Sequence, residues 1–236
     1  MWSGPRNIST ALMRSWGSRP DTIVCDEPLY AHYLLRTGKP HPGADEVIRC
    51  HDTDWRRVVA WLTGDLPEGK TIFYQKHMAH HLRPEIDRAW LAKLFNCFLI
   101  RDPEEMLTSL VHNVRQPELA DTGLPQQVEI FDLVRRETGR TPPVLDARDV
   151  LEQPEAMLRR LCAALGVEFL PCMLHWEPGP RPTDGVWAKY WYAAVEQSTG
   201  FAPYRPKPQR VPAELRPLER ECRRLYEYLY AHRRTA

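Results

Sequence analysis

The first ten residues gather several groups that could bind an anion. The stretch from Trp2 to Thr10 is rich in small and polar residues and runs directly into an apolar helical segment at 11–16. A small-residue turn that opens into a helix leaves backbone N–H groups without intrahelical partners, and the helix dipole adds partial positive charge there. The side chains of Arg6, Ser9 and Thr10 add further donors. Together these features predict a phosphate cradle.

The loop departs from the common nucleotide-binding pattern. Gly-x-x-x-x-Gly-Lys-Ser/Thr requires a Gly-Lys pair before its hydroxyl residue, whereas Asn7 and Ile8 precede Ser9 here. A simpler alternative is that Ser9 and Thr10 only cap the first helix. Polar groups elsewhere in the chain must decide between these interpretations.

Short apolar runs alternate with helical segments along most of the chain. Strands are predicted at 22–25, 71–74, 97–100 and 144–145, and helices at 55–62, 90–94, 103–114, 124–138 and 154–165. This alternation predicts an α/β fold with a parallel sheet that helices cover on both faces. Because so little chain precedes the cradle, either the first strand is very short or the true start of the chain lies upstream.

Polar residues follow each predicted strand, at the edge where open parallel sheets bind ligands. Besides the opening loop, these positions are Asp26 with Glu27, the segment 76–81, and Arg101 with Asp102. We expect their side chains to converge on one site.

Two of these segments resemble anion-binding motifs of sulfotransferases. The stretch from Pro5 to Thr10 is similar to their 5′-phosphosulfate loop, Pro-Lys-Ser-Gly-Thr-Thr, with Arg6 in place of Lys and Ile8 in place of Gly. Arg101, with Ser109 eight residues later, has the spacing with which that family holds the 3′-phosphate of its donor. A guanidinium is a planar fork that fits phosphate oxygens, and a Ser two turns along the next helix can face the same anion.

A third fragment, 144–169, is similar to the family's strand, turn and following helix. It differs at Arg148, which replaces a Glu, and at Ala147, which replaces an aromatic position that can contact adenine. The chain thus resembles a divergent sulfotransferase branch whose loop reads Ser-Gly-Pro-Arg-Asn-Ile-Ser-Thr. The resemblance spans residues 2–170 and implies a three-layer αβα, P-loop NTPase-like fold with a central parallel sheet.

The resemblance also implies a reaction. The donor would be 3′-phosphoadenosine 5′-phosphosulfate (PAPS), the product adenosine 3′,5′-bisphosphate (PAP), and the acceptor a hydroxyl or amine of a small molecule, with no metal. Arg6 would stabilise charge on the leaving 5′-phosphate, since a guanidinium stays protonated. The donor-binding residues that it implies are Arg6, Asn7, Ile8, Ser9, Thr10, Arg101 and Ser109.

The base that deprotonates the acceptor has several candidates. The family commonly uses a His shortly after a Lys in this strand-end segment, and some branches use a Glu. His77, next to Lys76, is the first choice and Glu27 the second. His80 and His81 stay open, because the familiar pattern is Lys-x-His. A neutral His suits this task at pH 7, whereas the pKa of Glu27 would have to be raised by burial.

Two other functions stay open. A P-loop-like nucleotide or metabolite kinase would need the Gly-Lys-Ser/Thr loop, which is missing, and a strand-end Asp for magnesium, which Asp26 and Asp102 supply only weakly. A non-catalytic nucleotide-binding protein would keep the loop and Arg101 but lose the chemistry through Arg6 and Ile8.

Composition limits the partners. The 236-residue chain carries a net charge of +1, which excludes a global attraction to nucleic acid or to an anionic membrane. Its six cysteines lack metal-ligand spacing, and no apolar run approaches the roughly 18 residues of a membrane span. We therefore expect reduced thiols and a cytoplasmic protein.

Length and the absence of repeats predict a single domain, 1–236. The proline-rich segment 202–212 would link it to a C-terminal helix whose apolar stripe, 215–229, packs on the core of a monomer or, as the lesser alternative, forms a homodimer seam. The aromatic cluster 187–192 is expected in the core. If it lines a pocket, it suits an apolar or aromatic acceptor.

Overall fold

Five parallel strands form the centre of the fold. The computed structural model describes residues 1–112, 114–206 and 210–233. The strands lie in the order β2-β3-β1-β4-β5, and each neighbouring pair is parallel. They are β1 (Trp2–Ser3), β2 (Thr22–Asp26), β3 (Ile72–Met78), β4 (Phe98–Ile100) and β5 (Val144–Asp146). The predicted α/β class is confirmed, and the first strand is indeed short.

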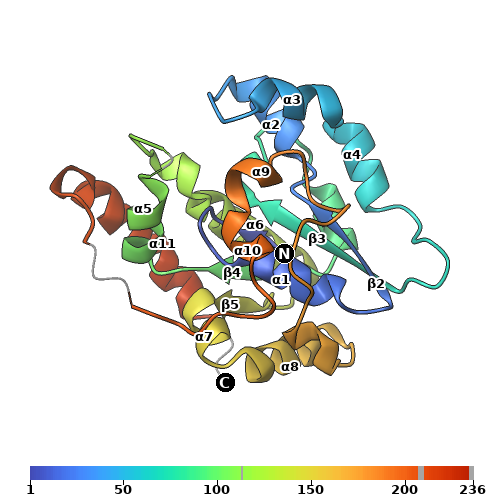
Figure 1. Cartoon of the computed structure of the whole chain (residues 1–236). Helices are drawn as coiled ribbons and strands as arrows, with labels where there is room; N and C mark the ends of the chain where they lie inside the picture. Colours follow the sequence, from blue (N-terminus) through green and yellow to red (C-terminus); the bar gives the residue numbers. More distant parts are fainter. Residues whose placement is uncertain (113, 207–209, 234–236) are drawn as a thin grey trace.

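Helices cover both faces of the sheet, which gives the fold three layers (Figure 1). Side chains alternate along β4, so that Phe98 and Ile100 belong to one apolar core and Leu99 to the other. The helices over the first core are α4 (Trp55–Leu62), α5 (Pro103–Leu110), α6 (Leu124–Thr138) and α11 (Arg216–Tyr230). The helices over the second core are α1 (Ser9–Gly17), α7 (Ala147–Glu152) and α8 (Pro154–Leu165).

A third apolar cluster lies past the carboxyl end of β2. Its elements are α2 (Tyr30–Thr37), α3 (Ala44–Cys50), α9 (Ala188–Trp191) and α10 (Ala193–Glu196). Figure 1 shows α9 close to α2 and α3, although the chain between them contains most of the sheet. Trp187 and Tyr192 are 2% and 5% exposed in this cluster, so part of the aromatic segment is core, as expected.

Short 3-10 turns complete the described secondary structure. They are η1 (Ala79–His81), η2 (Ala89–Lys93), η3 (Leu119–Thr122), η4 (Pro171–Leu174) and η5 (Ala213–Leu215). The sequence pattern predicts a helix around 90–94, but this segment is the turn η2.

Strand β3 is longer than the sequence pattern predicts. The β-rich run ends at Tyr74, yet the strand continues to Met78. The reason is pairing on both sides: Lys76 lies opposite Asp26 of β2, and His77 lies opposite Trp2 of β1. Pairing with the backbones of β1 and β2, rather than the apolar residues of β3 itself, therefore determines where β3 ends.

The C-terminal helix α11 packs against α5 and α6. Cys222 and Leu229 on this helix are completely buried. Part of the proline-rich segment 202–212, residues 207–209, lies outside the described residues. Among the helices that the structure describes, none is long and apolar enough to cross a membrane.

The turn between β1 and α1 follows a constrained path. A Cβ built on Gly4 would lie 2.4 Å from the carbonyl oxygen of Thr122. Two residues later Arg6 adopts a φ of 57°, a left-handed conformation that non-glycine residues rarely adopt. Close backbone approach and local strain together determine where the cradle lies.

We expect Gly4→Ala to lower the free energy of unfolding by about 1–3 kcal/mol, because the methyl group would overlap a rigid backbone oxygen. Urea unfolding followed by circular dichroism measures this change. Gly17→Ala is the matched control, since its Cβ would meet only the Val24 side chain, at 3.5 Å. Equal losses in the two variants would contradict the close approach at Gly4.

Candidate active site

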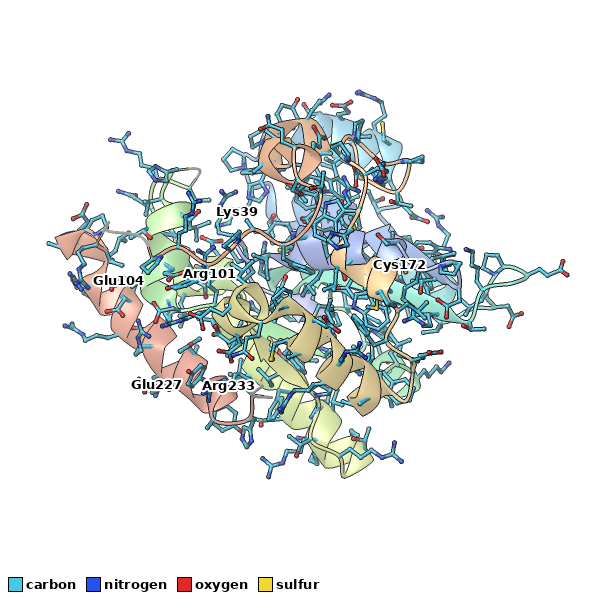
Figure 2. The ribbon with its side chains drawn as sticks, turned by 60° about the horizontal axis from the view of Figure 1, so that its bottom comes forward. Lys39, Arg101, Glu104, Cys172, Glu227 and Arg233 are labelled. Carbon is cyan, nitrogen blue, oxygen red and sulfur yellow. The ribbon has the colours of Figure 1, made fainter. Side chains whose placement is uncertain are left out.

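A cavity of about 590 Å³ opens at the carboxyl ends of the strands. Its floor is the turn after β1, and its walls come from the ends of β2 and β3, from α5, and from the segment 191–203. Figure 2 labels Lys39 and Arg101, two of the basic residues that line it. The polar residues that follow the predicted strands thus converge, except that Asp26, His77 and Asp102 do not line the cavity. Asp102 instead caps α5 and pairs with Arg223.

One end of the cavity joins the opening loop to the α5 region. Arg6 Nε donates a hydrogen bond to Ser109 Oγ at 2.9 Å. Arg101 Nη1 donates to the backbone oxygen of Arg6 at 2.6 Å. The two resembling motifs, about a hundred residues apart in the sequence, therefore form one continuous surface with two arginines, which we call the cationic end.

The sheet holds the rest of the loop in place, and no side chain caps the N-terminus of helix α1. Asn7 Nδ2 donates to the carbonyl oxygen of Leu99 at 3.0 Å, and Ile8 packs against the second core. Helix α1 begins at Ser9 without a side-chain cap and without an acidic residue in its first turn. Ser9 and Thr10 line the cavity but do not cap the helix with their side chains. Its N-terminal N–H groups thus favour an anion.

The two arginines of the cationic end differ in their pairing. Arg101 Nε and Nη2 donate to Glu105 Oε2 at 3.1 Å and 3.0 Å, an ion pair between the end of β4 and the first turn of α5. Arg6 has its Nε on a neutral hydroxyl. Partial burial, and then the charge of Arg101, lower the pKa of Arg6. An anion placed between the two guanidinium groups would relieve their repulsion.

His77 does not line this cavity. Its neighbours Lys76 and Met78 do, and successive side chains of a strand point to opposite faces. The His77 ring stacks on Trp2 with centroids 4.2 Å apart and is only 3% exposed. Its Nε2 lies 3.2 Å from Gln75 Oε1. The expectation that His77 faces the acceptor is therefore corrected: the longer β3 turns it into the first core, where burial lowers its pKa well below the usual value.

A buried ion cluster occupies the other end of the cavity. Lys76 Nζ donates to Asp26 Oδ1 at 2.8 Å, to Glu27 Oε1 at 2.7 Å and to the Tyr192 hydroxyl at 2.6 Å. The Tyr192 hydroxyl in turn donates to Asp26 Oδ2 at 2.7 Å. Lys76 and Asp26 are almost completely buried, and 11% of the Glu27 side chain is exposed. One ammonium group therefore pairs with two carboxyl groups and ties the segment between α9 and α10 to the strand ends.

Glu27 has the features of a base. Burial raises its pKa, and the charge of Lys76 opposes this rise only in part. Its φ of 40° is the second left-handed non-glycine conformation in the described chain. Oε1 is taken by Lys76, whereas Oε2 lies 3.9 Å from His81 Nδ1, too far for a hydrogen bond. This second oxygen is thus available on the cavity side.

His80 and His81 also line the cavity, and both are buried. Burial lowers the pKa of His80 to about 3 and that of His81 well below its usual value, so both rings are neutral at pH 7. The Nδ1 atoms of both rings have no hydrogen-bond partner among the described residues. Such buried polar atoms favour a ligand that can pair with them.

A comparison with protein families shows which family the chain belongs to. The model described as "Sulfotransferase domain" matches residues 1–217. The chain belongs to the sulfotransferase domain family. The predicted membership is thereby confirmed, on a match that includes both halves of the cationic end.

Solved structures agree with this membership at the level of the fold. The sulfotransferase domain of the Synechococcus PCC 7002 olefin synthase is similar with a TM-score of 0.56 and 18% identity, over 97% of this chain and 92% of that one. The sulfotransferase domain from the curacin biosynthetic pathway is similar with a TM-score of 0.52 and 14% identity, over 100% of this chain and 97% of that one. The three-layer arrangement is thus that of known sulfotransferase domains.

Two curated relatives carry a different name. They are the branched-chain-amino-acid aminotransferase-like proteins 1 and 2 of Arabidopsis thaliana, 37% and 35% identical over 235 and 232 residues. The alignments cover 98% of this chain but 41% of each relative. The sulfotransferase domain therefore matches less than half of those longer proteins.

Several residues of the cavity were not predicted from the sequence. Tyr30, Tyr33 and His41 line it, and Lys39 pairs with Asp121 at its edge at 2.8 Å. These residues lie between predicted elements and belong to no recognisable motif. Asp26 and Glu27 could have indicated from the sequence that Lys76 lies buried beside them, because a buried ammonium requires carboxylate partners.

Among the described residues, no group of three or more His, Cys, Asp or Glu side chains could hold a metal ion.

We expect Lys76→Met to destabilise the sulfotransferase domain by about 3–5 kcal/mol at pH 7, because it leaves two buried carboxyl groups without their cation. Without Lys76 the pKa of Glu27, already raised by burial, rises further. The deficit relative to wild type therefore shrinks as the pH falls through this raised pKa, since a protonated carboxyl group needs no cation. Urea unfolding at pH 7.5 and pH 5.5 measures both effects.

The control is Arg148→Met, which removes the partner of Glu152 in an exposed pair. Exposed pairs contribute little, so this variant should unfold like wild type at both pH values. A deficit for Lys76→Met that is small, or that does not depend on pH, would show that the cluster is not the buried charge site described above.

Proposed function

We propose that this domain transfers a sulfuryl group from PAPS to a hydroxyl or amine of a small-molecule acceptor. The observation that carries the proposal is the cationic end, where Arg6 donates a hydrogen bond to Ser109 and its backbone oxygen accepts one from Arg101. In the transfer, the acceptor atom forms a bond to sulfur, the bond from sulfur to the 5′-phosphate oxygen breaks, and the acceptor proton passes to a base. PAP leaves with the electron pair of the broken bond.

The residues present fit this donor. The cavity volume of about 590 Å³ lies within the range of ligand sites, about 300–1,000 Å³. The uncapped N-terminus of α1 would hold one anionic group, and Arg101 with Ser109, which both line the cavity, would hold a second. The bound donor supplies an activated sulfuryl group with PAP as its leaving group.

Arg6 is the electrostatic catalyst in this proposal. Its guanidinium lies at the cavity between the loop and Ser109, where charge grows on the leaving 5′-phosphate. A group that stays protonated stabilises that charge without giving up a proton. Loop residues Asn7 to Thr10 keep the N-terminus of α1 directed at the same oxygens.

Arg101 must exchange partners to hold a 3′-phosphate. In the described conformation its fork faces Glu105, which also accepts a hydrogen bond from the Tyr204 hydroxyl. A phosphate group competes with this carboxylate for the same N–H donors. We therefore propose that Glu105 tunes the affinity for the 3′-phosphate.

Glu27 is the base in this proposal. Its Oε2 is the oxygen that Lys76 leaves unbonded, and its raised pKa brings it closer to the range in which a carboxylate abstracts protons efficiently. His81 lies 3.9 Å from this oxygen and can orient the acceptor as a neutral ring. His77, on the other face of the sheet, has no part in it.

We expect PAP to raise the melting temperature by several degrees without metal, and more than adenosine 5′-phosphate does. Arg101→Ala should remove this preference, because it removes the charge-assisted hydrogen bonds to the 3′-phosphate, worth about tenfold or more in affinity. Thermal shift and isothermal titration measure it. A stronger shift with ATP and magnesium would favour a kinase, and no response to any nucleotide would contradict a donor site.

Glu105→Gln is the matched variant for the same site. It keeps the size of the side chain but removes its charge, so Arg101 is released and PAP should bind more tightly than to wild type. Arg136→Ala, at the exposed pair with Glu137, should bind PAP like wild type. If Glu105→Gln bound PAP more weakly than wild type does, the proposal that Glu105 competes with the 3′-phosphate for Arg101 would be wrong.

We expect Glu27→Gln to lower turnover by about 10²–10⁴-fold while PAP affinity stays within about twofold, because a general base acts on the acceptor and not on the donor. Release of PAP from PAPS, followed by chromatography, measures turnover. His77→Phe, which keeps a ring on Trp2, should retain most of the activity. The opposite result, an inactive His77→Phe and an active Glu27→Gln, would return the role of base to His77.

A further inference from the structure

The acceptor end of the cavity has a wall of neutral rings. We call Tyr30, Tyr33, His41 and Trp191 the aromatic wall; all four line the cavity. His41 is its centre, with ring centroids 5.8 Å from Tyr30, 6.0 Å from Tyr33 and 6.5 Å from Trp191. The Tyr30 hydroxyl and His41 Nδ1 are 2.8 Å apart, which holds two of these rings in place. Burial lowers the pKa of His41, so the wall carries no charge at neutral pH.

The charges beside this wall do not cancel. Asp26 and Glu27 share the single ammonium of Lys76, and within the described ranges no other Lys or Arg pairs with either carboxyl group. Lys39 and Asp121, also at this end, neutralise one another. When both carboxyl groups are ionised, the cluster of Asp26, Glu27 and Lys76 therefore keeps one negative charge.

Neutral rings beside an uncompensated carboxylate are the chemistry that binds an organic cation. The faces of Trp and Tyr attract ammonium groups, most strongly where water is excluded, and a carboxylate adds Coulomb attraction. An acidic acceptor would be repelled by the same carboxylate. A neutral apolar acceptor would leave the negative charge unpaired.

The buried histidine beside Glu27 favours a hydroxyl as the reacting group. His81 is 2% exposed, and its Nδ1 has no hydrogen-bond partner among the described residues. The 3.9 Å between this atom and Glu27 Oε2 is wide enough for an oxygen that bonds to both. The ring of His81 stacks on Tyr30, with centroids 4.7 Å apart, so the hydroxyl position adjoins the aromatic wall.

From these observations we infer that the acceptor is a small alcohol that carries an ammonium group, with the cation against the aromatic wall and the hydroxyl between Glu27 and His81. The inference rests on the proposed sulfuryl transfer. Glu27 takes the hydroxyl proton, the alcohol oxygen forms the bond to sulfur, and the bond from sulfur to the 5′-phosphate oxygen breaks, which releases PAP. The product is a zwitterionic sulfate ester.

The test compares two alcohols that differ in charge alone. Choline and 3,3-dimethylbutan-1-ol have the same shape, with nitrogen in the first where the second has carbon. In isothermal titrations with and without saturating PAP, choline should bind about tenfold more tightly than the neutral alcohol. Equal affinity, preference for the neutral alcohol, or no binding of either would overturn the inference.

A pair of variants assigns the preference to the wall. Trp191→Leu should lower the choline preference to about threefold or less, whereas Trp191→Tyr, which keeps a ring, should retain it. Trp191 is partly exposed, so both variants should fold, and their melting temperatures check this. If both variants kept the full preference for choline, Trp191 would not contact the cation, and the assignment of the cation site to the aromatic wall would be wrong.

The same titrations separate the two proposals. If PAP binds and the two alcohols bind equally, the ammonium site is wrong and the donor assignment stands. If choline is preferred in the free protein but PAP does not bind, the ammonium site stands and the sulfuryl transfer is wrong.

Discussion

One buried ammonium group joins the ends of β2 and β3 to the segment between α9 and α10. Lys76 Nζ is hydrogen-bonded to Asp26 and Glu27 at the end of the neighbouring strand and to Tyr192 from a distant helical segment. Charged groups are stable in a protein interior only when they are paired, so these elements must meet for any of them to be buried. The apolar packing of Trp187 and Tyr192 with α2 and α3 then closes the same region. Electrostatics and packing together thus determine where the aromatic wall lies.

The order of the strands explains how the cationic end forms. Strand β1 lies between β3 and β4, so the turn that follows it reaches the helix after β4 on one side and the end of β3 on the other. Arg6 can therefore bond to Ser109 while the same cavity contains Lys76 and Glu27. A two-residue strand suffices because its neighbours on both sides are hydrogen-bonded to it.

The cavity has opposite character at its two ends. Basic side chains and a helix N-terminus line one end, while a carboxylate, neutral histidines and aromatic rings line the other. In the proposed reaction, this separation would let the domain stabilise negative charge at one end and abstract a proton at the other without the two groups neutralising each other. The ion pair of Arg101 with Glu105 is the exception, because it places a carboxylate at the cationic end.

The sequence by itself determined the family, the alternation of strands and helices, and the cationic end. Continuous apolar runs such as 97–100 mark buried strands, and the loop around Arg6 and the spacing of Arg101 and Ser109 are local patterns. Only the tertiary structure decided which acceptor-side residues reach the cavity. Pairing with β1 and β2 extends β3 past its apolar run, and because side chains alternate along a strand, Lys76 faces the cavity and His77 faces the core. The contacts of Lys76 with Tyr192 and of His41 with Trp191 join distant segments, which no local pattern in the sequence can reveal.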